Sequence, residues 1–352
     1  MNHWKEAEVL ITGGAGFVGS NLVRKLIEKG IKKIVIVDNL LSSEPENIPE
    51  TEQVAFLKGS IADDGILRQI DDNFDYIYHL STYHGNQNSI HDPLADHENN
   101  VLSTLKFFHW IHNFKKLKKL VYSGAGCAVA EKTFHTARPT REEDAVSLDM
   151  DSPYSISKIV GEFYAVYFHK QYGLPTVRAR FQNVYGPGEI LGAGKWRGTP
   201  ATVWRNVIPT FIYKALKREA LPLENEGRAT RDFIYVDDIV RGLMLCAECG
   251  SSGDIYNLAS GLETSVKRLA EMVNELTGNP TPVKLLPRRE WDRSGRRFGS
   301  IVKAKEKLGF MAEIPLMEGL TRTIAWTRDN LAFIEKTIVK HTPFMDECSE
   351  IR

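Results

Sequence analysis

The chain has 352 residues, which is enough for one large α/β unit or for two lobes with a sizeable core. Lysine plus arginine and aspartate plus glutamate each number 45, so the formal net charge is zero. This balance argues against a nucleic-acid partner or an anionic membrane surface. No apolar run approaches the roughly 18 residues that cross a bilayer, and the first residues do not resemble a secretory leader. We therefore expect a cytoplasmic protein with no membrane partner.

Strand and helix patterns alternate through the first half, as in a doubly wound parallel sheet. Strands are predicted near 8–12, 33–37, 53–57, 75–80, 118–123 and 175–181, and helices near 17–29, 63–70, 94–113 and 153–172. After a loop rich in glycine and proline at 185–200, the predicted elements are helices near 203–218, 237–249, 264–277, 303–308 and 316–339, strands at 232–235 and 255–258, and a basic loop at 287–297. The last dozen residues are expected to be loosely ordered.

This order of elements predicts an α/β fold with two interleaved domains. A Rossmann-type domain with a doubly wound parallel sheet is expected over 1–182, and 230–260 return to it. The segments 183–229 and 261–340 are expected to form a smaller α/β domain for the substrate.

A glycine-rich turn, Thr12-Gly-Gly-Ala-Gly-Phe-Val-Gly19, separates the first predicted strand from the first helix. Gly13, Gly16 and Gly19 allow a sharp turn, a close approach to a pyrophosphate, and helix–strand packing without a side chain between. The helix N-terminus adds unpaired N–H groups and a positive dipole for the phosphates. Asp38 ends the next strand, where a carboxylate accepts hydrogen bonds from a ribose 2′-hydroxyl and repels a 2′-phosphate. The pattern predicts NAD rather than NADP as the cofactor.

Tyr154 and Lys158 open the predicted helix 153–172 with the spacing YxxxK. Residues four apart share a helix face, so the ammonium can lie close to the phenol. A nearby positive charge stabilises a phenolate, which makes Tyr154 a candidate general base. On its own the pattern is common, but here it follows a dinucleotide motif in one alternating α/β unit.

Taken together, these motifs resemble an extended short-chain dehydrogenase/reductase of the nucleotide-sugar epimerase and dehydratase group. The resemblance also rests on the segments Asp38–Leu40, Arg180–Pro187, Thr230–Asp238 and Tyr256–Ser260. It implies that tyrosine removes the proton of the sugar 4-hydroxyl while NAD⁺ takes the C4 hydride, and that the 4-keto sugar is reduced again. The cofactor contacts that it implies are Gly13, Gly16, Phe17, Val18, Gly19, Asp38, Asn39, Leu80, Asn100, Tyr154 and Lys158.

The end of the strand 118–123 departs from the family pattern. Ala125 stands where the family has a serine or threonine that contacts the sugar, which leaves Ser123 as a candidate catalytic hydroxyl. The carboxyl groups expected of a 4,6-dehydratase or a UDP-glucuronate decarboxylase are absent from this segment. Cys127 matches an acid/base cysteine of GDP-mannose 3,5-epimerases, although Gly198 replaces the lysine of those enzymes. The leading prediction is therefore C4 epimerisation of an NDP-hexose, with proton exchange at C3 or C5 through Cys127 as the alternative.

The resemblance also implies contacts to a UDP- or GDP-sugar. Asn183 is expected near the sugar–phosphate junction, and Arg231 and Arg293 at the phosphates, with Arg296 a further possibility. Lys195 lies close to the position of the missing lysine. His84 and Glu131 are additional candidates for sugar contacts.

The sequence also raises the questions of a metal site, a non-catalytic role and a dimer contact. Cys246 and Cys249 form a CxxC, but no second ligand pair accompanies them, so no metal site is expected. A non-catalytic NAD-binding scaffold is supported only by the loss of a hydroxyl at Ala125. The helix 153–172 is apolar nearly all round, which fits either burial within the chain or a homodimer contact together with 94–113.

Overall fold

Seven apolar segments form one parallel sheet, since each is rich in residues that pack well on a pleated surface. The structure, a computed structural model, describes residues 3–131, 133–293 and 295–350. The strands are β1 (Glu8–Thr12), β2 (Lys33–Asp38), β3 (Val54–Lys58), β4 (Tyr76–His79), β5 (Lys119–Ala125), β6 (Thr176–Phe181) and β11 (Ile255–Leu258). Their order is β11-β6-β5-β4-β1-β2-β3, and every neighbouring pair is parallel. The predicted doubly wound α/β class is confirmed.

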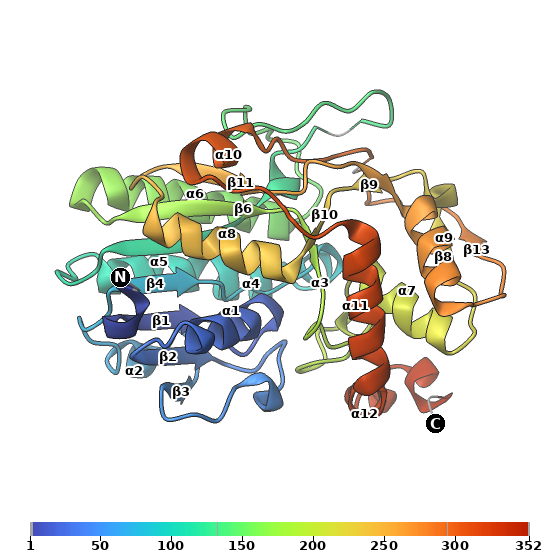
Figure 1. Cartoon of the computed structure of the whole chain (residues 1–352), viewed down its shortest axis with the longest axis horizontal. Helices are drawn as coiled ribbons and strands as arrows, with labels where there is room; N and C mark the ends of the chain where they lie inside the picture. The colour runs from blue at the N-terminus through green and yellow to red at the C-terminus, as the bar shows by residue number, and fades with distance from the viewer. Residues whose placement is uncertain (1–2, 132, 294, 351–352) are drawn as a thin grey trace.

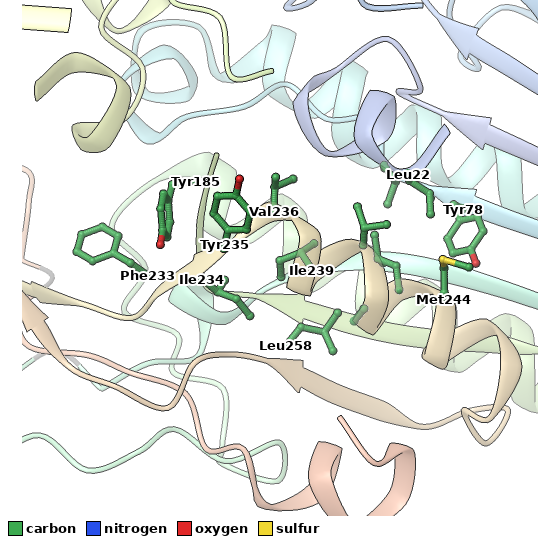
Figure 2. Packing of buried hydrophobic residues seen from close by; sticks show 14 of the residues in the cluster. Leu22, Tyr78, Tyr185, Phe233, Ile234, Tyr235, Val236, Ile239, Met244 and Leu258 are labelled. Carbon is green, nitrogen blue, oxygen red and sulfur yellow. The ribbon is translucent and has the colours of Figure 1, made fainter. Parts of the chain in front are cut away.

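Helices cover both faces of this sheet (Figure 1). They are α1 (Phe17–Glu28), α2 (Asp64–Leu67), α3 (Asn86–His91), α4 (Pro93–Asp96), α5 (Ser103–Ile111), α6 (Pro153–Tyr172) and α8 (Val236–Glu248). Alternate strand residues point to opposite faces, so Val9 and Ile11 join one buried cluster and Leu10 joins another. Figure 2 shows the first cluster, where Met244 of α8 lies beside Tyr78 of β4 and near Leu22 of α1.

A smaller group of elements lies beside the sheet (Figure 1). Its helices are α7 (Val207–Leu216), α9 (Val266–Thr277), α11 (Leu316–Asp329) and α12 (Leu331–Val339). Three two-stranded sheets pair β7 (Asn183–Tyr185) with β10 (Phe233–Tyr235), β8 (Pro222–Glu224) with β13 (Lys284–Leu286), and β9 (Thr230–Arg231) with β12 (Thr264–Ser265). The helix α10 (Val302–Leu308) lies beside β11 instead. Over the described ranges, every helix is too short or too polar to cross a bilayer.

Three predicted features differ in the structure. The helix expected over 316–339 is interrupted at Asn330, whose amide donates to the Trp326 carbonyl at 2.8 Å and so competes with the helical backbone. The helix expected over 94–113 consists of α4, a π-helical turn at His97–Leu102 and α5. The chain end, expected to be loosely ordered, forms short 3₁₀ turns as far as 350, and Cys348 is fully buried.

The helix α6 begins and ends as its sequence dictates. Ser152 is the N-cap and accepts from the Ser155 N–H, Pro153 occupies the first turn, and Gly173 ends the helix with φ of 72°. Phe168 is buried against the sheet, whereas Phe163 and Tyr167 on the same helix are 60% and 50% exposed. The apolar circumference of this helix therefore includes one face that the chain itself leaves uncovered.

The position of the site follows from the strand order. The order reverses between β1 and β4, and ligands of open α/β sheets bind at the carboxyl ends of the strands at such a switch point. The turns after β1, β2, β4 and β5 all reach this edge.

Candidate active site

The glycine turn after β1 leaves no room for side chains at two positions. Gly13 has φ of +75°, and a Cβ built on it would lie 2.6 Å from the Ser81 backbone nitrogen. A Cβ on Gly19 would lie 2.2 Å from the Gly13 carbonyl oxygen. Gly16 is the N-cap of α1, so the free N–H groups of that helix begin here. The turn is a cradle for a pyrophosphate at a helix N-terminus, which fits a bound dinucleotide.

Asp38 holds this turn in place. One carboxylate oxygen accepts from the Ala15 N–H at 3.0 Å, and the other accepts from the Leu40 N–H at 2.9 Å and from the Ser43 hydroxyl at 3.0 Å. Burial raises the pKa of Asp38, while these hydrogen bonds oppose the rise. The carboxylate is therefore pre-positioned at the end of β2, where a ribose hydroxyl would meet it.

A cavity of about 380 Å³ extends from the glycine turn along the edge of the sheet. Of the predicted residues, its wall includes Gly13, Gly16, Phe17, Val18, Gly19, Asp38, Asn39, Leu80, Ser123, Cys127, Tyr154, Lys158 and Asn183. Its far wall is formed in part by Arg289, Trp291 and Arg297. The dinucleotide motif and the tyrosine–lysine pair thus meet in one space.

Tyr154 and Lys158 enter the cavity from the first turns of α6. Burial raises the pKa of Tyr154, the nearby Cys127 and Asp96 add to the rise, and a side-chain hydrogen bond with Thr82 lowers it. Burial lowers the pKa of Lys158 to about 8, against the opposing effects of Glu162, Asp96 and Cys127. A lysine that is charged at neutral pH beside a phenol can stabilise the phenolate.

The end of β5 provides one hydroxyl and one thiol. Ser123 accepts from the Lys158 ammonium at 3.4 Å and donates to the His79 carbonyl at 3.1 Å. Ala125 lines the cavity beside them and carries no polar atom. Cys127 lies in the following 3₁₀ turn and packs with Tyr154 in a small apolar cluster. His84 lies edge-on to the Tyr154 ring at 5.7 Å, and burial lowers the pKa of His84 to about 3, so this imidazole is neutral.

Four predicted contacts lie elsewhere. Arg293 and Lys195 are absent from the described residues that line the cavity. The Arg293 guanidinium faces Asp149 at 2.7 Å instead, and Lys195 is exposed on the loop surface. Arg231 lies behind the cavity wall and donates to the Gly295 carbonyl at 2.9 Å, and Asn100 is occupied by hydrogen bonds to its own chain.

Arg296, Glu131 and Gly198 also have defined surroundings. Arg296 pairs with Glu263 at 2.7 Å, and Glu131 lies at the surface 3.6 Å from Arg138. Gly198 has φ of +86°, and a Cβ there would lie 2.1 Å from the His91 ring. A lysine would therefore be strained in this backbone conformation.

Several lining residues were not predicted as site residues. Thr82 and Gln87 follow β4. Ligands of open α/β sheets bind at the carboxyl ends of the strands, and this rule could have indicated both residues. Glu189 and Arg205 come from the long loop after β7, which has no periodicity to predict their direction. Glu189 is buried, one carboxylate oxygen accepts from the Asn206 amide, and the other has no hydrogen-bond partner among the described residues. Burial raises the pKa of Glu189 to about 7, an effect that Arg205 and Asn206 oppose.

Comparison with known proteins assigns this geometry to a family. The model of the NAD dependent epimerase/dehydratase family matches residues 9–259. The structure resembles that of the Bordetella bronchiseptica enzyme WbmF solved with NAD⁺ and UDP, with 57% sequence identity, a TM-score of 0.89, and coverage of 99% of this chain and 100% of that one.

Two curated relatives bear on the reaction. A putative UDP-glucose 4-epimerase of Methanocaldococcus jannaschii is 31% identical over 92% of this chain and 99% of its own length. UDP-glucuronic acid decarboxylase 5 of Arabidopsis thaliana is 28% identical over 89% of this chain and 86% of its own length. The relatives thus include enzymes of more than one reaction type.

Proposed function

The chain belongs to the NAD-dependent epimerase/dehydratase family, and from that premise we propose that it is an epimerase that inverts C4 of a nucleotide-sugar through a transient 4-keto sugar. NAD is its cofactor, and the glycine cradle and the Asp38 carboxylate would hold it. When bound, NAD supplies a hydride acceptor that can return the hydride to the same carbon.

In this proposal Tyr154 is the general base for the sugar 4-hydroxyl. Its phenolate oxygen takes the hydroxyl proton as the C4 hydride leaves, and the phenol so formed returns the proton when the ketone is reduced. Lys158 stabilises the phenolate through its charge, and Ser123 holds the ammonium at 3.4 Å. Inversion requires only that the 4-keto sugar present its other face before reduction.

The observation that carries the choice of epimerisation is the scarcity of carboxyl groups in the cavity. Among the described lining residues, the acidic ones are Asp38 and Glu189. Asp38 is engaged by three donors at the end of β2, and Glu189 is held by Asn206 on the loop that borders α1. Elimination or decarboxylation at the sugar needs a further positioned acid or base. This supports a reaction that Tyr154 completes alone.

Proton exchange at C3 or C5 is the alternative, and Cys127 is the observation that favours it. Its thiol lines the cavity beside Tyr154, and a 4-keto group acidifies the adjacent C–H bonds. Such an exchange also needs a second acid/base to protonate the opposite face. Gly198, which stands where a lysine would supply that group, has no side chain, and this weighs against the alternative.

A nucleoside diphosphate on the sugar suits the far wall of the cavity. Arg289 and Arg297 line it, and the partly buried Arg231 adds positive charge near Arg297. Guanidinium groups bind phosphate oxygens in a bidentate way. Binding of UDP by the similar WbmF supports a nucleotide partner.

We further propose a homodimer through the exposed apolar face of α6, which includes Phe163 and Tyr167.

The test is incubation of the protein with a panel of UDP- and GDP-hexoses and uronic acids in D₂O. Products read by NMR and mass are expected to be inverted at C4 without deuterium. Tyr154→Phe should lower kcat by about 10²- to 10⁴-fold, the usual contribution of a general base. Tyr213→Phe, on α7 away from the cavity, is the matched control.

Three other outcomes contradict this proposal. Deuterium at C3 or C5, lost in Cys127→Ala, would assign the alternative reaction. Loss of water or carbon dioxide from the sugar would assign elimination or decarboxylation. A protein that holds NAD, converts no sugar of the panel and is unchanged by Tyr154→Phe would be a scaffold.

A further inference from the structure

One residue of the cavity wall lies beside the proposed base and has no part in the mechanism above. Thr82 lies three residues beyond the end of β4 and lines the cavity that Tyr154 enters, and its side chain acts to lower the pKa of the Tyr154 phenol. Its hydroxyl donates to the Asn100 side-chain oxygen at 3.0 Å. Thr82 therefore lies between the phenol and a buried amide.

The partner amide is fixed in position. The Asn100 nitrogen donates to the Tyr83 carbonyl at 3.2 Å, to Asp96 at 2.8 Å and to the Ser157 hydroxyl at 3.2 Å. Its oxygen accepts from the Tyr83 N–H at 2.7 Å as well as from Thr82. If Thr82 turned its proton toward the phenol, the Asn100 oxygen would keep one donor, and no buried polar atom would lose its only partner.

The hydroxyls on the β5 side do not offer this freedom. Ser123 donates to the His79 carbonyl at 3.1 Å and accepts from Lys158, so its proton is directed away from the phenol. Ala125 has no hydroxyl at all. Thr82 approaches from the segment after the neighbouring strand, β4, and its proton has two alternative acceptors.

We propose that Thr82 is a positioning residue that donates a hydrogen bond to the Tyr154 phenolate when the base has lost its proton, and that it supplies the hydroxyl that the end of β5 lacks. The inference rests on the proposed role of Tyr154 as the base. In the resting state the Thr82 proton lies on Asn100, and after phenol ionisation it rotates about the Cβ–Oγ bond onto the phenolate. No covalent bond forms or breaks at Thr82.

The other charged and titratable groups around the phenol define what Thr82 must offset. From α4 and the turn after β5, Asp96 and Cys127 disfavour the phenolate. From α6, Lys158 favours it as a cation. His84, in the segment after β4, is neutral, and its ring makes a T-shaped contact with the Tyr154 ring. A neutral donor aimed at the phenol oxygen adds to the stabilisation by Lys158.

The experiment compares Thr82→Val, which keeps the shape and removes the hydroxyl, with Thr82→Ser, which keeps the hydroxyl. Thr210→Val is the matched control, because Thr210 is a buried threonine of α7 whose hydroxyl has no hydrogen-bond partner within the ranges that the structure describes. In the NAD-loaded protein, Thr82→Val should lower kcat about ten- to hundredfold at neutral pH, the factor typical of one hydrogen bond to a charged group. It should also move the acidic limb of the kcat–pH profile upward by about one pH unit or more, with little change in KM. Thr82→Ser should restore both.

A loss of kcat that is equal at every pH and is not rescued by Thr82→Ser would overturn the proposal, as would an unchanged profile. Titration of the Tyr154 phenol by NMR, with ¹³Cζ-labelled tyrosine and Tyr154→Phe for assignment, separates this inference from the proposed reaction. If no nucleotide-sugar is converted, a higher phenol pKa in Thr82→Val than in the wild type still supports it. An equal pKa in both proteins, or a phenol that stays protonated through pH 11 in both, overturns it.

Discussion

Glu189 makes the stability of this protein depend on pH in a direction opposite to that of a paired surface carboxylate. Its side chain is buried, one oxygen has no hydrogen-bond partner in the described part of the chain, and burial raises its pKa from the usual 4.5 to about 7. The folded state therefore binds the proton more tightly than the unfolded state does. The free energy of unfolding should fall as the pH rises from about 4.5 to about 7, and should stay lowered above that range.

The size of this effect follows from the same change. At about 1.4 kcal/mol per pH unit, a rise from 4.5 to about 7 corresponds to about 3 kcal/mol. Glu189→Gln keeps an oxygen for the Asn206 amide and cannot ionise. The variant should match the wild type in stability near pH 4.5 and exceed it by about 3 kcal/mol at pH 8.

The assay is urea unfolding of both proteins at half-unit pH steps from 4.5 to 8, at one fixed NAD concentration. The difference between the two curves isolates Glu189 from other titrating groups. Glu52→Gln, at an exposed glutamate, is the matched control for the substitution itself. A flat difference for Glu189→Gln, or one that favours the wild type at high pH, would refute the reasoning that burial dominates this carboxyl.

Three further predictions concern the cofactor and the oligomer. Asp38→Asn removes the charge at the expected ribose site and one of the two oxygens that accept from the Ala15 and Leu40 N–H groups. The affinity for NAD should therefore fall about ten- to hundredfold, and the ratio of NAD affinity to NADP affinity should decrease. Titration calorimetry with both cofactors measures these two changes. Gly19→Ala places a Cβ 2.2 Å from the Gly13 oxygen, so the purified variant should release little or no NAD on denaturation while the wild type releases a stoichiometric amount. Phe163→Lys alters a side chain that is 60% exposed, so it should turn a sedimenting dimer into a monomer without lowering Tm; a wild type that already sediments as a monomer contradicts the proposed interface.

The parts of the site that the sequence predicts are those with local causes. Gly13 and Gly19 are required by the backbone of one turn, and Tyr154 and Lys158 by the spacing of one helix. The direction of Arg293 has no local cause, because it is set by Asp149, 144 residues away in sequence. The basic loop has no periodicity, so the sequence could not predict that Arg289 and Arg297, rather than Arg293, line the cavity.

The same distinction explains the fold. Strands with continuous apolar runs are predicted nearly to the residue, because a parallel sheet buries both faces. The break at Asn330 leaves the helical period of the apolar residues almost intact, so it cannot be read from the pattern. The position of Lys195 depends on a loop in which Gly192, Gly194 and Gly198 all have positive φ, and a chain of such turns has no sequence period.

The fate of one proton links the site to the proposed reaction. His84 has a pKa of about 3, so it is neutral and cannot store a proton near neutrality. The two carboxyl groups of the described wall, Asp38 and Glu189, accept hydrogen bonds from Ser43 and Asn206. In the proposed reaction Tyr154, with Lys158 beside it, is then the group of the described wall that takes and returns the hydroxyl proton, and Cys127 belongs to the alternative reaction. A proton that returns to the oxygen from which it came leaves the substrate with its original atoms. This is the physical reason to expect an isomer as the product, and it makes the stereochemistry at C4 the property that the cavity must control.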